Sequence, residues 1–247
     1  MLHGGPGAPG DASVLARELG ARFRVLEPFQ REDGPEPLTV AGHVEDLRGV
    51  VASLGAGAKP GLVGHSWGAM LALAFGAAHP GAVGRIALVG CGTFDPATRV
   101  FFRGRIEERT DPETRRRLEA AGAITDPGAR LRARFAALDR LYFIDPVTTD
   151  TGVDHVSERG HRESWEDMLR LQAAGVYPAA FRAIRCPVLM LHGADDPHPG
   201  PAIRDSLRPH LPQIEYREWA RCGHYPWLER SAREEFLEVL GGWLAET

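Results

Sequence analysis

Short apolar runs alternate with segments of helical periodicity in the first and last thirds of the chain. The runs with the length and composition of buried strands are 23–28, 60–66 (a strand running into a turn), 85–92, 186–193 and 213–219. Apolar residues at helical spacing, or a long Ala/Leu run, mark the segments 43–56, 69–80 and 231–246. Strands that alternate with helices predict an α/β fold, with a mostly parallel sheet covered by helices on both faces.

The middle of the chain, 95–178, has a different pattern. It is rich in Arg and Glu, and it contains no convincing buried strand. Amphipathic spacing predicts helices within 111–123, 127–143 and 161–175. The block is longer than an ordinary crossover connection. We therefore expect a helical lid at 95–178, inserted between a first core part at 1–94 and a second at 179–247. Plain surface crossover helices are the alternative.

Composition excludes several classes of protein. The 247 residues carry a net charge of −4, which gives no general attraction to nucleic acid or anionic lipid. No apolar run approaches the roughly 18 residues that a membrane span requires, and no signal peptide pattern opens the chain. The three cysteines, Cys91, Cys186 and Cys222, are sparse and lack metal-ligand spacing. They favour a reducing compartment, so we expect a cytoplasmic location.

One pentapeptide stands out between a predicted strand and a predicted helix. Gly64-His65-Ser66-Trp67-Gly68 fits the pattern G-x-S-x-G. In that context the pattern indicates a tight turn that exposes a serine nucleophile at the end of a strand. Side chains at positions 64 and 68 would collide with nearby backbone, so glycine is expected at both. A free serine hydroxyl is a poor nucleophile, and it requires a base.

Three further motifs lie outside the predicted strands and helices, one at the start of the chain and two directly after or near the end of predicted strands. His3 to Gly7 reads HGGPG, "GADDPH" follows the strand at 186–193, and "CGH" at 222–224 follows the last strand. With these motifs the sequence resembles the α/β-hydrolase fold family over essentially the whole chain. HGGPG looks like the turn of its prolyl-aminopeptidase-like branch.

The resemblance implies a role for each motif. Ser66 would be the nucleophile, Asp196 the acid and His224 the base of a catalytic triad. The backbone N–H groups of Gly5 and Trp67 would form the oxyanion hole, where one donor typically contributes ~10²–10³ in rate. Asp95, after the preceding core strand, is the main alternative acid.

Candidate substrate-binding residues are Trp165, Glu163 and His198, although each reads equally as lid packing or solvated surface. A metal site built from Asp195, Asp196 and His198 has no supporting ligand spacing, so we expect no metal and no cofactor.

The expected function is a serine hydrolase that cleaves an ester, amide or C–C bond of a small molecule through an acyl-enzyme. A proline iminopeptidase-like aminopeptidase is an alternative. Pro197 follows Asp196, however, at a place where that branch can carry a glutamate for the substrate amine. A non-catalytic ligand receptor and a lyase or cofactor-free oxygenase on the same fold are further alternatives. We expect neither nucleic acid nor membrane as a partner, and no pattern indicates an oligomeric state.

The start of the chain departs from the family pattern. In this fold the HGGPG turn follows an interior strand, but only Met1 and Leu2 precede His3. An absent interior strand leaves backbone groups of both neighbours unpaired. We therefore expect the N-terminal strands to be missing and the natural start to lie upstream.

Overall fold

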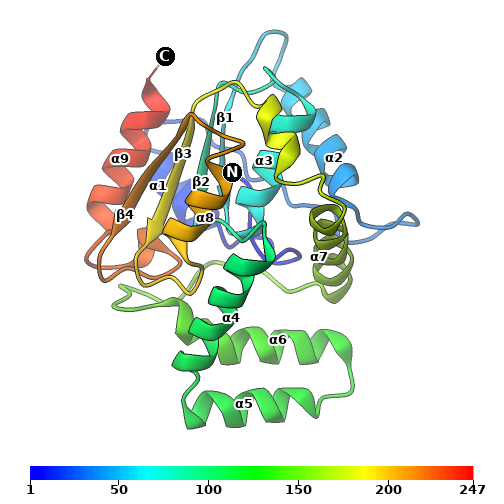
Figure 1. Ribbon diagram of the computed structural model, residues 1–247, viewed down its shortest axis with the longest axis vertical. Coiled ribbons are helices and arrows are strands. Elements are labelled where there is room, and N and C mark those ends of the chain that lie inside the picture. The colour runs from blue at the N-terminus through cyan, green and yellow to red at the C-terminus, as the bar shows by residue number, and fades with distance from the viewer. Residues whose placement is uncertain (247) are drawn as a thin grey trace.

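A four-stranded parallel sheet forms the centre of the molecule. The computed structural model describes residues 1–246, in which the strands follow chain order as β1-β2-β3-β4 (Figure 1). The strands are β1 (Gly61–His65), β2 (Arg85–Val89), β3 (Val188–Gly193) and β4 (Ile214–Trp219). The sheet confirms the predicted α/β class. All strands end at the same edge, so loops that follow them meet there.

Strands β1, β2 and β3 are apolar on both faces because helices cover both faces. Alternate strand residues belong to two buried clusters, one on each face of the sheet. The first contains Leu62, Ile86, Leu88, Val188 and Met190. The second contains their chain neighbours Val63, Ala87, Val89, Leu189 and Leu191. Successive strand side chains point to opposite faces, so a continuous apolar run is what a doubly covered strand requires.

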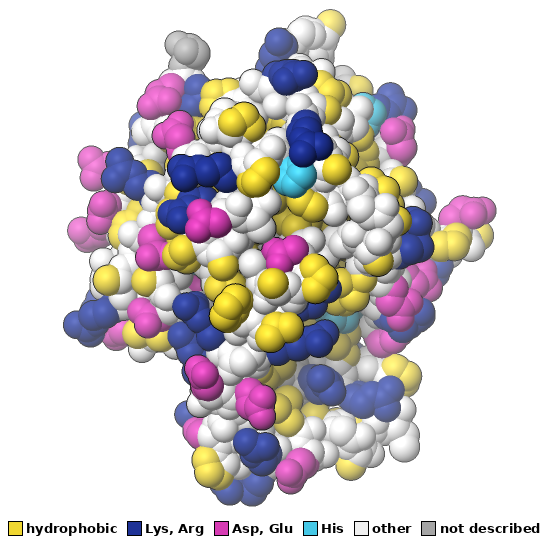
Figure 2. All heavy atoms as spheres, viewed as in Figure 1, with side chains coloured by type: hydrophobic (Ala, Val, Ile, Leu, Met, Phe, Trp, Pro, Cys, Tyr) yellow, Lys and Arg dark blue, Asp and Glu magenta, His cyan; other side chains and the backbone are white. Residues whose placement is uncertain are grey.

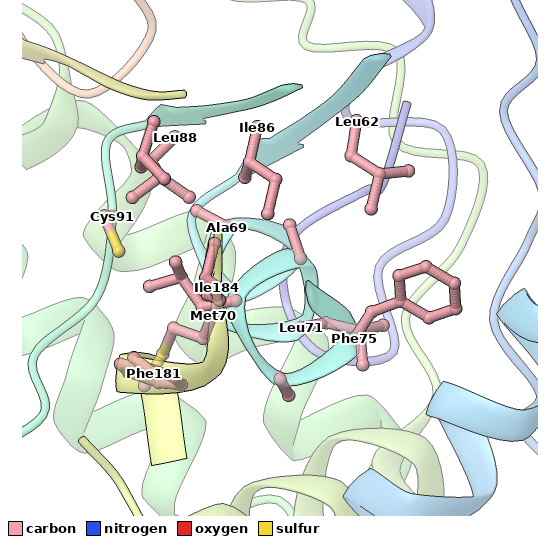
Figure 3. Close-up of a cluster of buried hydrophobic side chains, with 14 of the residues drawn as sticks. Leu62, Ala69, Met70, Leu71, Phe75, Ile86, Leu88, Cys91, Phe181 and Ile184 are labelled. Carbon is pink, nitrogen blue, oxygen red and sulfur yellow. The ribbon is translucent and has the colours of Figure 1, made fainter. Parts of the chain in front are cut away.

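Helices α1 (Ser13–Leu19) and α9 (Arg233–Ala245) cover one face of the sheet. Helices α2 (Val40–Ser53), α3 (Trp67–Ala78) and α8 (Gly200–Leu207) cover the other. Helix α3 is buried from Trp67 to Gly76, which explains its nearly uniform apolar composition. Figure 3 shows Met70 of α3 next to Phe181 of a short helix, η2 (Ala179–Ala183), with Leu71 and Phe75 on the other side of α3.

The segment between β2 and β3 is helical, as predicted. Helices α4 (Pro96–Arg109), α5 (Pro112–Gly122) and α6 (Pro127–Leu138) lie together at one end of the molecule, away from the sheet (Figure 1). The 3₁₀ turn η1 (Asp139–Tyr142) and α7 (Glu158–Ala173) follow. Helix α7 lies beside α2, and its Met168 is part of the core. The domain boundaries at 94 and 178 stay a prediction.

Each helix of the α4–α6 group begins with the same device. Asp95, Asp111 and Asp126 accept a hydrogen bond from the backbone N–H three residues later, at 2.9, 2.7 and 2.7 Å. Proline follows each aspartate at the first helical position, where a missing N–H costs nothing. Basic side chains are frequent on the surface of these helices (Figure 2).

The expected strand at 23–28 is not a strand in the structure, so that prediction was wrong. These residues have no ladder partner among the described residues and run as irregular chain. A cavity of about 270 Å³ with mostly apolar walls separates them from Gly61–Val63 of β1. Within residues 1–246, Leu2 forms an isolated bridge to β1, opposite Gly64, and the carbonyl oxygen of Leu26 accepts a 2.6 Å hydrogen bond from the amino group of Met1. A strand needs a continuous series of hydrogen bonds to a neighbouring strand about 5 Å away, and this one bond does not supply it.

Among residues 1–246, no helix is both long and apolar enough to cross a bilayer.

Candidate active site

Ser66 occupies the turn between β1 and α3 with a backbone conformation that serine rarely adopts, φ 53° and ψ −115°. The flanking glycines make this turn possible. A Cβ on Gly64 would lie 2.2 Å from the carbonyl oxygen of Gly68, and one on Gly68 would lie 2.2 Å from that of Leu2. Both distances are far below van der Waals contact. The predicted reason for the two glycines is thus confirmed, and strain at Ser66 is typical of a functional turn.

The HGGPG turn packs directly against the start of α3. Gly5 has φ 106°, which favours glycine, and it lines the same cavity as Ser66 and Trp67. Within residues 1–246, the N–H groups of Gly5 and Trp67 donate no hydrogen bond to the protein. Free N–H groups at a helix start are suited to binding an oxyanion.

Asp196 and His224 lie in the loops that follow β3 and β4. Asp196 is fully buried, and its Oδ2 accepts a 2.6 Å hydrogen bond from Nδ1 of His224. This bond leaves Nε2 of His224 as the nitrogen that can accept a proton. Burial opposes ionisation of Asp196, but the nearby His224, His198 and His192 more than offset it and hold the pKa of Asp196 well below its ordinary value.

His198 shares the same carboxylate. Its Nδ1 lies 3.0 Å from Oδ1 of Asp196, and its ring stacks on that of His224 with the centroids 4.8 Å apart. The backbone N–H of His198 donates to the same oxygen at 2.8 Å. His198 therefore supports the acid and also lines the cavity.

Asp196, His198 and His224 also offer one potential metal-ligand atom each within 4.8 Å of one another. Their mutual hydrogen bonds already account for this cluster, since the carboxylate oxygens accept from the two rings. Asp195 is not a member of that group.

Sequence reasoning missed a buried pair that connects the parts of this site. Oδ1 of Asp11 accepts from the N–H of Gly4 at 2.8 Å, and its Oδ2 lies 2.8 Å from Nδ1 of His65. Nε2 of His65 donates to the carbonyl oxygen of His224 at 3.2 Å. Asp11 and His65 thus hold together the HGGPG turn, the turn at 64–68 that carries Ser66, and the loop that carries His224. A single aspartate in a loop carries no sequence signal for this role.

Ser66 and His224 open onto one cavity of about 630 Å³ between the sheet edge and the α4–α7 region. Trp165, Phe102 and Tyr142 supply aromatic walls. The volume is in the range of small-molecule sites. Two hydrogen bonds connect the α4–α7 region to the loops that carry Asp196 and His224. Arg105 of α4 donates to the carbonyl oxygen of Asp196, and the backbone N–H of His224 donates to the carbonyl oxygen of Tyr142.

Other candidate residues lie elsewhere. Glu163 does not line the cavity. Its carboxylate accepts from the N–H of Leu38 at 3.0 Å and pairs with Arg159. Asp95, the alternative acid, caps α4 and does not line the cavity.

Burial sets the expected pH dependence. It lowers the pKa of His224 from 6.5 to about 4, although the Asp196 carboxylate partly offsets this. A histidine can accept a proton only when it is neutral, so a lowered pKa would widen the pH range in which His224 can act as a base toward acid. We expect kcat/KM for an uncharged ester to be flat from pH 5 to 8 and to fall only as pH drops through about 4. Circular dichroism on the same samples checks that the fold persists. A midpoint near 6.5 would contradict the burial argument.

With this geometry in view, comparison with known proteins identifies the class. Residues 1–239 match the model of the "Alpha/beta hydrolase family", and the chain belongs to that family. A curated relative is the 2-hydroxy-6-oxononadienedioate/2-hydroxy-6-oxononatrienedioate hydrolase of Paraburkholderia phymatum (strain DSM 17167 / CIP 108236 / LMG 21445 / STM815). It is 26% identical over 98% of this chain and 86% of its own. The protein is thus an α/β hydrolase.

Solved structures agree on the fold. An esterase from Thermogutta terrifontis has a TM-score of 0.64 at 21% identity, over 98% of this chain and 87% of its own. The proline iminopeptidase of Mycobacterium smegmatis has a TM-score of 0.60 at 21% identity, over 98% and 88%. Esterases and a peptidase both occur among these neighbours, so the prolyl-aminopeptidase-like branch stays a prediction.

Proposed function

We propose that the protein is a serine hydrolase that cleaves an ester, amide or C–C bond of a small molecule through an acyl-enzyme. The observation that carries the proposal is the convergence of Ser66 and His224 on one cavity, with Asp196 bonded to His224 behind it. We assign Ser66, His224 and Asp196 to the nucleophile, the base and the orienting acid.

In the first half of the reaction, Ser66 Oγ attacks the substrate carbonyl carbon while Nε2 of His224 takes the hydroxyl proton. The oxyanion forms against the N–H groups of Gly5 and Trp67. The tetrahedral intermediate collapses, and His224 returns the proton to the leaving group. In the second half, water gives a proton to His224 and attacks the acyl carbon. The acid product leaves, and Ser66 regains its proton.

Charge in the cavity favours this proposal over the aminopeptidase alternative. Recognition of a free substrate amine calls for unpaired carboxylates. Of the acidic residues that line the cavity, Asp11 is bonded to His65 and Gly4, and Asp139, whose pKa burial raises to about 6, shares the lining with Arg99, Arg103 and Arg132. The curated relative's name describes a dioate, an acidic substrate. All three cysteines are free, and we propose a cytoplasmic location on that basis.

A fluorophosphonate probe tests the proposal. We expect one covalent adduct, mapped to Ser66 by mass spectrometry, that forms on the folded chain and not on heat-denatured chain. A His224→Gln variant should label far more slowly, because the serine then lacks its base. Folded chain that stays unlabelled, or labelling equal in the His224→Gln variant, would contradict the proposal and favour a non-catalytic receptor.

A further inference from the structure

The cavity that holds Ser66 is lined by arginines with no carboxylate partner. Arg99 and Arg103 lie one turn apart on α4, and Arg132 comes from α6. We call these three the cavity arginines. Among residues 1–246, none of them forms an ion pair. By contrast, Arg116 and Arg117 on α5 share Glu113.

Arg99 is the most constrained of the cavity arginines. It is partly buried, and its Nε is buried without a hydrogen-bond partner among the described residues. One of its terminal nitrogens donates to the Gln172 amide oxygen, and the Gln172 amide nitrogen in turn donates to the carbonyl oxygen of Thr93 at 3.2 Å. The guanidinium is therefore held in place beside the cavity wall, with donors to spare.

The electrostatics around Arg99 favour an added negative charge. Burial and the positive charge of Arg103 lower the pKa of Arg99, and Asp95 offsets this only in part. The Asp95 carboxylate is already occupied, since it accepts from the N–H and the hydroxyl of Thr98 at 2.9 and 2.7 Å. An unpaired, partly buried cation is costly, and a bound anion would relieve that cost.

We propose that Arg99, assisted by Arg103, binds a carboxylate of the substrate that is remote from the bond cleaved at Ser66. This inference rests on the proposed function and deepens it, because it makes the substrate an acid that carries a second, hydrolysable acyl bond. A planar guanidinium matches a carboxylate with two parallel hydrogen bonds, which lysine cannot reproduce. The aromatic walls would hold the apolar chain between the two ends.

The test compares esters that differ only in a terminal charge. The probes are mono-4-nitrophenyl esters of adipate, pimelate and suberate, against 4-nitrophenyl hexanoate, heptanoate and octanoate. At the chain length that fits, we expect kcat/KM to favour the charged ester at least tenfold. Arg99→Gln should lower kcat/KM for that ester by about 10- to 100-fold, mainly through KM. The neutral ester should change less than about threefold.

Two further variants separate charge recognition from structure. Arg99→Lys keeps the charge and should restore part of the preference, whereas Arg117→Gln, an exposed arginine paired with Glu113, should change neither substrate. Equal turnover of charged and neutral esters by the unaltered enzyme would overturn the inference, and so would an Arg99→Gln variant that slows both equally.

Failure of the proposed function gives a different pattern. In that case no ester is cleaved, and Ser66 does not react with fluorophosphonate. Calorimetric titration with monomethyl adipate, which has one free carboxylate, and with methyl hexanoate, which has none, still decides on the arginines. Tighter binding of monomethyl adipate that Arg99→Gln abolishes supports the carboxylate site, and equal binding of the two esters overturns it.

Discussion

Replacing Ser66 with alanine is expected to reduce kcat for an activated ester by about 10⁶-fold, because the whole triad acts through this one oxygen. The oxyanion hole and the cavity persist in the variant, so a residual rate above that of water is expected. The variant should unfold at nearly the same temperature, since Ser66 Oγ makes no hydrogen bond among the described residues. Steady-state turnover and a thermal melt are the two measurements.

A matched control for this variant is Ser206→Ala. Ser206 lies on α8, where its hydroxyl donates to the carbonyl oxygen of Ile203, and it does not line the cavity. Its turnover should equal that of the unaltered enzyme. Retention of substantial turnover in Ser66→Ala would assign the chemistry to another group and refute the acyl-enzyme.

Replacing Asp196 with asparagine is expected to lower kcat by about 10⁴-fold, because the amide nitrogen would face Nδ1 of His224 as a donor. Nδ1 would then have to accept, and the proton would sit on Nε2, where His224 cannot take one from Ser66. The isosteric change keeps the buried volume. In this orientation the amide oxygen occupies the place of Oδ1, so it still accepts from the backbone N–H and from Nδ1 of His198.

Two neighbouring aspartates provide the comparison. Asp195 is the adjacent residue, and Asp95 caps α4, a role that asparagine also fills. Asp195→Asn and Asp95→Asn should each leave kcat within about twofold. The assignment of the acid fails if either of them loses more activity than Asp196→Asn. Measurement of 4-nitrophenolate release gives kcat for the unaltered enzyme and for all three variants.

The turn around Ser66 could be predicted from the sequence because residues close together in the chain require it. Gly64 and Gly68 are four residues apart, and the clash that excludes a side chain at Gly64 is with the backbone of Gly68 itself. The strand before the turn and the helix after it are marked by their own apolar composition. A family resemblance then sufficed to relate Asp196 and His224 to Ser66 across the chain.

The strand predicted at 23–28 shows the limit of local reading. Its composition suits a strand, but a strand exists only where a neighbour supplies hydrogen bonds. The structure places a cavity between that segment and β1. The candidate substrate-binding residues show the same limit, because only contacts with distant segments decide which of them line the cavity. Trp165 faces the cavity, whereas Glu163 is committed to the N–H of Leu38, a partner 125 residues away.

The sequence by itself determined the class of fold and the glycine-flanked turn that carries Ser66, since apolar periodicity and glycine spacing are properties of adjacent residues. The roles of Asp196 and His224 came from the family resemblance and stay a prediction. Only the tertiary structure brought Asp11 to His65 and assembled the cavity arginines from α4 and α6. These groups are remote from the nucleophile turn along the chain. Their chemistry depends on burial and on the presence or absence of a partner charge, and only packing of distant segments sets those quantities.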